Sequence, residues 1–211
     1  MTEAIERYTF RERIMHWLTA LTYCYCLGTG LALYTPHLFW ISLIMGGAAT
    51  SRYWHPLVGV LFLMGSLWMH DVWRREMNIT ETDKRWLDRV ENYIANRDDL
   101  VPLQDRFNAG QKLFYWLMFY GALLLLLSGF FLWLPEYVPR QAAWVRGLMI
   151  LVHESAALLT IGGFVIHIYM GVFLEPGSMT AITAGYVSKA WAKTYHRLWY
   201  IRATGGEPPK E

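Results

Sequence analysis

The chain is poor in charge and in cysteine. Only 17% of its 211 residues are charged and the net charge is +2, and no basic cluster interleaved with aromatic residues is present, so we exclude nucleic acid as a partner. The two cysteines, Cys24 and Cys26, stand two apart in an apolar segment, where their side chains diverge on a helix. We interpret them as packing residues.

The sequence also lacks tandem repeats and low-complexity segments. Its first apolar segment follows a mixed-charge N-terminus and has no small-residue cleavage site, which argues against a removed signal peptide. What the chain has in abundance is apolar mass: 55% of residues are hydrophobic and 16% aromatic, with 11 tryptophans. This composition predicts one integral membrane domain over residues 1–211.

Four apolar runs reach the length of about 20 residues that a helix needs to cross a bilayer. They are residues 15–34, 55–73, 113–134 and 148–174. The pattern predicts an all-α protein, an integral membrane four-helix bundle whose two ends lie on the same side of the membrane. Aromatic and basic residues alternate at helical spacing over about 178–200, which predicts a further helix along the lipid interface.

Basic residues identify the side on which the ends lie. Three of the 19 Lys and Arg residues lie in the connections 35–54 and 135–147. The other sixteen lie in the N-terminus, the 74–112 connection and the tail from 175. The positive-inside bias therefore predicts that the N- and C-termini and the 74–112 connection are cytoplasmic.

Two histidines lie in the last apolar run. His153 and His167 are fourteen residues apart, so on a helix they share a face and are separated by about 21 Å along the axis. Ionisable residues within a membrane are rare and usually functional. The alternative is that both only hydrogen-bond to neighbouring helices.

Two other histidines lie at matching depths. His55 opens the second run from the outer side, level with His153, and His16 opens the first run from the cytoplasm, level with His167. Neutral imidazole is a good ligand for haem iron, and no C-x-x-C-H attachment motif is present. The depths therefore predict two haem groups, each held by two axial histidines.

Further residues repeat a known pattern in order and spacing. They are His16-Trp17, His55-Pro56 with Gly59, Asn108-Ala109-Gly110-Gln111-Lys112, Ser128-Gly129 with Trp133 and Pro135, His153, His167-Ile168-Tyr169-Met170 and Trp191-Ala192-Lys193. With them the chain resembles, over nearly its whole length, the gamma subunit of formate dehydrogenase-N, a dihaem cytochrome b.

The resemblance implies the partners and the electron path. Electrons from formate oxidation would arrive from a catalytic alpha subunit containing molybdenum or tungsten, through an iron–sulfur beta subunit, and would reduce quinone on the cytoplasmic side. The outer haem b would be held by His55 and His153 and the inner haem b by His16 and His167. The chain would also anchor the complex in membrane lipid. The resemblance leaves open whether the complex forms a higher oligomer.

The resemblance further implies a quinone site at Asn108, Gly110 and Gln111, near His167. An amide and free backbone N–H groups suit the carbonyl oxygens of a quinone. Asn108 has a second interpretation, as the residue that caps the third membrane helix.

Several alternatives stay open at this point. His70 lies fifteen residues after His55 and competes with His16 for the inner haem, and both His70 and Glu154 stand where small or apolar residues are expected. The cytochrome b of a nickel–iron hydrogenase or of another molybdoenzyme would share the histidine plan. A membrane transporter or proton channel could use intramembrane His, Glu154 and Asp71 as a relay, and a structural anchor would bind haem without reducing quinone. We expect His37 and His196 to be solvated.

Overall fold

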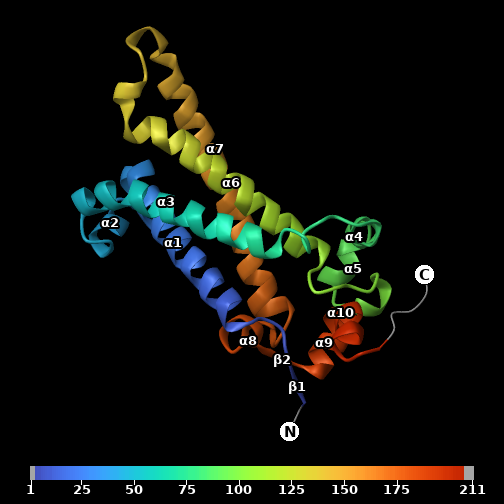
Figure 1. The fold of residues 1–211 in the computed structure, drawn as a ribbon. Helices are drawn as coiled ribbons and strands as arrows, with labels where there is room; N and C mark the ends of the chain where they lie inside the picture. Colours follow the sequence, from blue (N-terminus) through green and yellow to red (C-terminus); the bar gives the residue numbers. More distant parts are fainter. Residues whose placement is uncertain (1–2, 207–211) are drawn as a thin grey trace. The chain divides into compact units, whose positions relative to one another are not determined.

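The computed structural model describes residues 3–206 and is mostly helical (Figure 1). It divides into two compact units. The first contains the N-terminal residues up to Arg13, Val72–Trp116 and the C-terminal part from Phe164, and the second contains Ile14–Asp71 and Leu117–Gly163.

Four long helices contain the predicted spans. They are α1 (Phe10–Tyr34), α3 (Ala48–Trp73), α6 (Ala109–Trp133) and α7 (Trp144–Tyr169), which a π-helical turn, η5 (Met170–Leu174), extends. Within residues 3–206, three helices are long and apolar enough to cross a membrane: Ala48–Trp73, Ala109–Trp133 and Trp144–Leu174. The predicted first span is not among them, because threonine, tyrosine and glycine residues lower the mean hydropathy of α1.

In the second unit, small residues let helices approach closely. A Cβ atom added at Gly121 of α6 would lie 2.5 Å from Cγ2 of Thr160 on α7. A larger residue at this position would therefore clash with Thr160. Gly65 of α3 faces Thr19 of α1 in the same way. The short helix α2 (Trp40–Ile44) lies between α1 and α3 in the sequence. Large apolar side chains on the outside, such as Leu159, which is 65% exposed, are suited to lipid.

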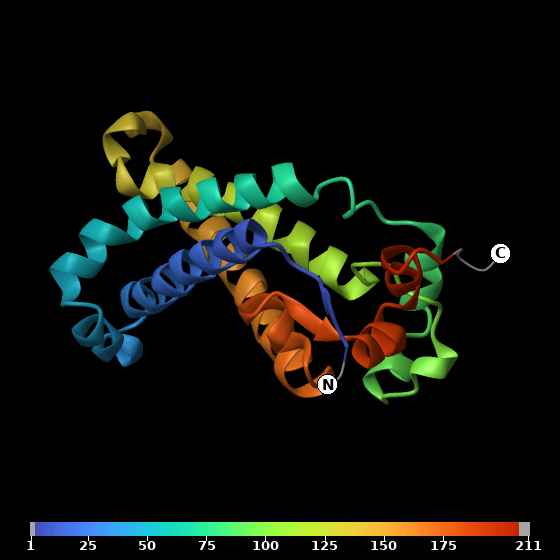
Figure 2. The ribbon, with the colours of Figure 1, turned by 60° about the horizontal axis from the view of Figure 1, so that its bottom comes forward.

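The first unit combines short helices with a small sheet. Strand β1 (Ala4–Glu6) pairs antiparallel with β2 (Tyr186–Ser188), with Ala4 opposite Ser188, a strand pair that the all-α prediction did not include. The helices of the middle connection are α4 (Glu81–Leu87) and α5 (Val90–Ile94). Figure 2 shows the strand pair and the C-terminal helices.

The C-terminal segment is interrupted where a single helix over 178–200 was expected. It forms α8 (Ser178–Thr183), β2, α9 (Lys189–Tyr195) and α10 (Arg197–Ala203). Gly185 explains the first break, because its φ of +94° belongs to the left-handed region and its carbonyl accepts hydrogen bonds from the backbone N–H groups of Arg7 and Tyr8. The N-terminal strand is thereby attached to this segment.

The expectation that His196 is solvated was wrong. Its side chain is fully buried between α9 and α10, with Nε2 3.0 Å from Nη2 of Arg7 and Nδ1 2.5 Å from the carbonyl oxygen of Asp105. Burial, and then the nearby Arg7 charge, hold the pKa of His196 well below its usual value, so its ring is neutral. His37, in contrast, is exposed as expected.

Candidate functional site

Two histidines of the second unit face each other from different helices. His55 lies on α3 and His153 on α7. Their ring centroids are 6.3 Å apart and their ring planes are inclined by 62°. The structure thus brings together two residues that the sequence placed at one depth, while their role as ligands stays a prediction.

A buried hydroxyl group contacts the Nδ1 atom of each ring. Thr29 Oγ1, from α1, lies 2.8 Å from Nδ1 of His55, and Ser128 Oγ, from α6, lies 3.0 Å from Nδ1 of His153. Each hydroxyl also donates a hydrogen bond to a carbonyl oxygen one turn earlier in its own helix, at 2.8 Å and 2.6 Å. Each hydroxyl is therefore shared between a ring and a carbonyl.

This sharing fixes the tautomer of both rings. A hydroxyl has one hydrogen, and the carbonyl oxygen can only accept it, so the hydroxyl oxygen must accept the Nδ1–H of the imidazole. Both Nε2 atoms then keep their lone pair. An outer hydrogen bond that fixes the tautomer and orientation of a ligating histidine is the usual arrangement in metal sites.

Glycines beside these hydroxyl residues leave room for the rings. A Cβ atom at Gly30 would lie 3.3 Å from Cε1 of His55, and one at Gly129 would lie 3.2 Å from Cε1 of His153. Both distances are tighter than most real Cβ contacts. A hydroxyl residue followed by glycine therefore orients one histidine from α1 and the other from α6.

The donor set and its spacing fit haem iron. A metal–nitrogen bond is about 2 Å long, and a ring nitrogen lies roughly 1 Å from the centre of its ring. The sum of these two lengths is close to half of the 6.3 Å between the two ring centroids. Two neutral imidazoles with lone pairs on Nε2 are suitable axial ligands. The outer pair could thus hold one haem between α3 and α7.

The other candidate ligands lie in different units. His16 belongs to the second unit, where its ring is nearly perpendicular to that of Trp17 with centroids 5.5 Å apart. His167 belongs to the first unit, where it stacks on Phe114 with centroids 4.3 Å apart. Their pairing therefore stays a prediction. The competitor His70 stacks on Phe119 of α6.

The capping role considered for Asn108 is confirmed. Its Oδ1 accepts a hydrogen bond of 2.9 Å from the backbone N–H of Gln111, and Oε1 of Gln111 accepts one of 3.0 Å from the backbone N–H of Asn108. This reciprocal pair satisfies two amide groups at the start of α6. The quinone role of Asn108, Gly110 and Gln111 is a separate matter and stays a prediction.

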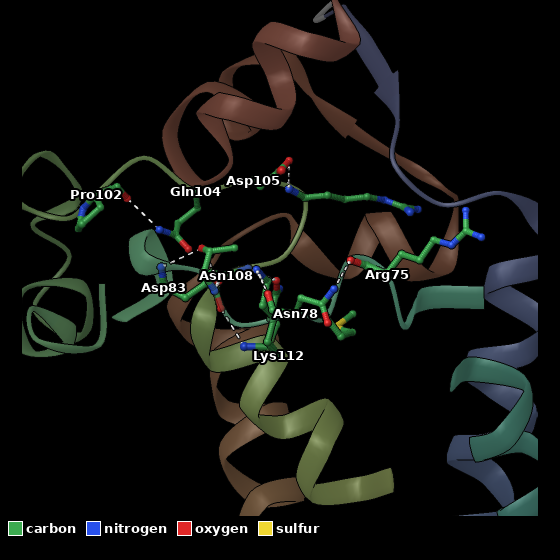
Figure 3. A network of polar contacts seen from close by, with 12 residues as sticks. Arg75, Asn78, Asp83, Pro102, Gln104, Asp105, Asn108 and Lys112 are labelled. Atoms are coloured by element: carbon green, nitrogen blue, oxygen red, sulfur yellow. Dashed lines mark hydrogen bonds and ion pairs between the residues drawn. The ribbon is translucent and has the colours of Figure 1, made fainter. Parts of the chain in front are cut away.

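A buried ion pair holds this end of α6 (Figure 3). Nζ of Lys112 lies 2.6 Å from Oδ2 of Asp83, with both side chains more than nine-tenths buried, and it donates a second bond to the carbonyl oxygen of Asn78. Asp83 also caps α4 through Thr80. Through Lys112, the connection after α3 is thereby attached to α6, one turn beyond Asn108.

A small pocket lies beside Asn108 in the first unit. It encloses about 20 Å³, which is room for one water molecule. Its lining includes Trp86, Tyr93, Asp98, Gln104, Asn108, Thr194, Tyr195 and Arg197. Tyr93, Asn108 and Asp98 therefore line one water-sized space.

Sequence reasoning missed the hydroxyl group that supports His55. Ser128-Gly129 was noted only as part of the resemblance, and Thr29-Gly30 was not singled out at all. The available signal was the repetition of a hydroxyl residue followed by glycine in two apolar runs, each of which faces a histidine helix.

Comparisons with known proteins identify the family that the chain is similar to. The family described as prokaryotic cytochrome b561 matches residues 7–185. The formate dehydrogenase cytochrome b556(fdo) subunit of Escherichia coli strain K12 is 32% identical over 198 residues, which are 94% of this chain and 92% of that protein. The nitrate-inducible cytochrome b556(Fdn) subunit of the same strain is 27% identical over 213 residues, covering 100% and 96%. The formate dehydrogenase cytochrome b556 subunit of Haemophilus influenzae is 28% identical, covering 93% and 82%.

Proposed function

Because the chain belongs to the prokaryotic cytochrome b561 family, which implies haem b, we propose that it is the cytochrome b subunit of a respiratory formate dehydrogenase. In this function it carries electrons from an iron–sulfur subunit across the membrane and reduces quinone on the cytoplasmic side. Haem, when bound, supplies a carrier of one electron at a time. The protein's own part is to hold, orient and shield the carriers.

The pairing of His55 and His153, each supported by a buried hydroxyl group, is the observation on which the proposal rests. His55 and His153 would be the axial ligands of the outer haem, with Nε2 available on both because Thr29 and Ser128 accept the Nδ1 hydrogens. A proton channel needs histidines that exchange protons. Two rings fixed as one tautomer by buried hydroxyls, with centroids 6.3 Å apart, a separation compatible with a metal ion between them, favour ligation.

The inner haem is proposed from sequence positions and family resemblance. His16 and His167 would be its ligands, because each lies near the cytoplasmic end of its apolar run and each matches a ligand segment of the family. His70 remains the competitor. The chain would then bind two haem b groups at two depths of a four-helix membrane domain with cytoplasmic termini.

The quinone site is proposed at the cytoplasmic start of α6. Asn108, Gly110 and Gln111 follow the middle connection, on the side where the basic residues gather, and His167 lies at the cytoplasmic end of its helix. An amide can donate to a quinone carbonyl, and a turn of α6 near its beginning offers backbone N–H groups. The capping bonds of Asn108 would hold its side chain in place for this contact.

The proposed complex lies in the bacterial inner membrane. The curated relatives are named as subunits of formate dehydrogenase. For this chain we propose an iron–sulfur subunit on the outer side as electron donor and, beyond it, a catalytic subunit with molybdenum or tungsten. The chain would anchor both to the lipid.

The quinone proposal is tested with Asn108→Leu in the intact complex. The variant should keep both haem spectra and their reduction by formate, while haem reoxidation by added quinone slows at least tenfold. Asn78→Leu is the control, because its side chain contacts only a backbone carbonyl within the middle connection. Equal quinone kinetics in wild type and Asn108→Leu would show that quinone reacts elsewhere.

A further inference from the structure

Glu175 and Tyr93 form a buried pair in the first unit. Glu175 is 3% exposed and Tyr93 is 5% exposed, and the tyrosine hydroxyl is hydrogen-bonded to the carboxyl group. Glu175 directly follows the π-helical turn η5, which ends α7, and Tyr93 comes from α5. Short π-helical segments occur frequently at functional sites. A carboxyl group is thus buried at the end of the helix that carries His167.

The surroundings of Glu175 favour a neutral carboxyl group. Burial raises the pKa of Glu175, and the Asp98 charge raises it further, whereas the Tyr93 hydroxyl and Arg7 lower it. Arg7 is also engaged elsewhere, by His196 and a carbonyl oxygen. Among the ion pairs of residues 3–206, none includes Glu175. Tyr195, a further titratable neighbour, stays protonated because burial raises its pKa too.

A neutral carboxyl group changes the direction of the hydrogen bond. It can donate its hydrogen to the Tyr93 oxygen, which leaves the hydrogen of that hydroxyl free to point elsewhere. The Asn108 side chain faces the Tyr93 hydroxyl, and both residues line the water-sized pocket. The pocket is also lined by Asp98, Thr194 and Arg197, polar residues of the connection and of the C-terminal helices. Glu175, Tyr93, the pocket and Asn108 therefore form a continuous polar route.

We propose that Glu175 and Tyr93 hold a proton and deliver it to a quinone carbonyl oxygen at Asn108, an inference that rests on the proposed quinone site. Reduction of one quinone to quinol takes two electrons, from formate, and two protons. As the quinone oxygen gains one proton, the O–H bond of Tyr93 breaks and Tyr93 takes the proton of Glu175. A proton from the cytoplasm, carried by water in the pocket, then reaches the Glu175 carboxylate through the Tyr93 hydroxyl. Cytoplasmic water supplies the second proton to the other carbonyl oxygen.

The test compares Glu175→Gln and Tyr93→Phe with wild type in the intact complex. Glu175→Gln keeps the shape of the side chain and removes its proton. Quinone reduction should slow about 100-fold in both variants, since a positioned acid contributes 10² or more. In wild type the rate should also fall as the pH rises through the pKa of Glu175, and this fall should disappear in Glu175→Gln. Both haem spectra should be unchanged.

A second readout does not depend on quinone turnover. The infrared spectrum of the quinone-free complex at pH 7 should contain the carbonyl band of a protonated carboxylic acid, which Glu175→Gln removes. Glu91→Gln, on the exposed side of α5, is the matched control and should keep both the band and the rate. An ionised Glu175 at pH 7, or an unchanged pH profile in Glu175→Gln, overturns the proton role.

The two proposals can fail separately. If Asn108→Leu slows quinone reduction and Glu175→Gln does not, the quinone site stands and the proton store is refuted. If Asn108→Leu has no effect, the quinone site is refuted, and the proton store proposed for it is refuted as well.

Discussion

Removing the hydroxyl of Thr29 should loosen the outer haem. Thr29→Val keeps the size and branching of the side chain but deletes the oxygen that accepts Nδ1–H of His55. Because Thr29 is fully buried, water cannot replace that oxygen. The ring would then have either an unpaired N–H group or the wrong tautomer, with its hydrogen on the nitrogen that should bind iron.

The expected loss of haem affinity follows from the hydrogen-bond acceptor that the Nδ1–H group of His55 loses. Leaving a buried donor unsatisfied costs about 1–3 kcal/mol. At about 1.4 kcal/mol for each factor of ten, this corresponds to a haem affinity lowered roughly 5- to 140-fold. Mutating an outer-shell partner of a metal-bound histidine typically has an effect of about the same size, 10- to 100-fold. The two ranges overlap, so we expect a measurable loss of haem affinity at the outer site alone.

The assay is transfer of haem from the purified complex to an excess of a haem-binding acceptor protein. One of the two haems should leave about 10- to 100-fold faster in Thr29→Val than in wild type. Thr22→Val is the matched control, because the Thr22 hydroxyl bonds only to backbone carbonyls of the same helix. Equal transfer rates in Thr29→Val and Thr22→Val would refute the tautomer argument.

Two further predictions concern other histidines. His16→Ala should lose the inner haem while His70→Ala keeps two haems per chain in a haem-pyridine spectrum, and the reverse result would assign the ligand role to His70. Since burial lowers the pKa of His196, the folded state binds fewer protons there than the unfolded state, and stability should decrease as the pH falls. Between about pH 6.5 and 5.5 the free energy of unfolding should fall by about 1 kcal/mol, a slope that His196→Asn removes and that His37→Asn, as control, retains.

The long helices could be predicted because apolar length alone determines them. Each predicted span lies almost entirely within one helix of the structure, with differences of a few residues at the ends. The C-terminal segment could not be predicted as well. Its first break depends on Gly185, whose conformation is tied to the backbone of Arg7 more than 170 residues away, and such pairing leaves no local pattern.

The histidine pair could be predicted, but its support could not. Depth along a helix follows from residue number, so the sequence is sufficient to place His55 and His153 at one level. The hydroxyl that orients His55 comes from α1, and only the packing of α1 against α3 shows that Thr29 faces it. The burial of Glu175 was equally hidden, because a glutamate just after an apolar run is usually exposed to solvent.

The central claim is that four histidines hold two haem b groups, and a haem-pyridine spectrum with protein quantification tests it most directly. We predict two haem b per chain in wild type and one in His153→Ala, with the remaining haem still reduced by quinol. Finding one haem or none in the intact wild-type chain, or two in His153→Ala, would contradict the account.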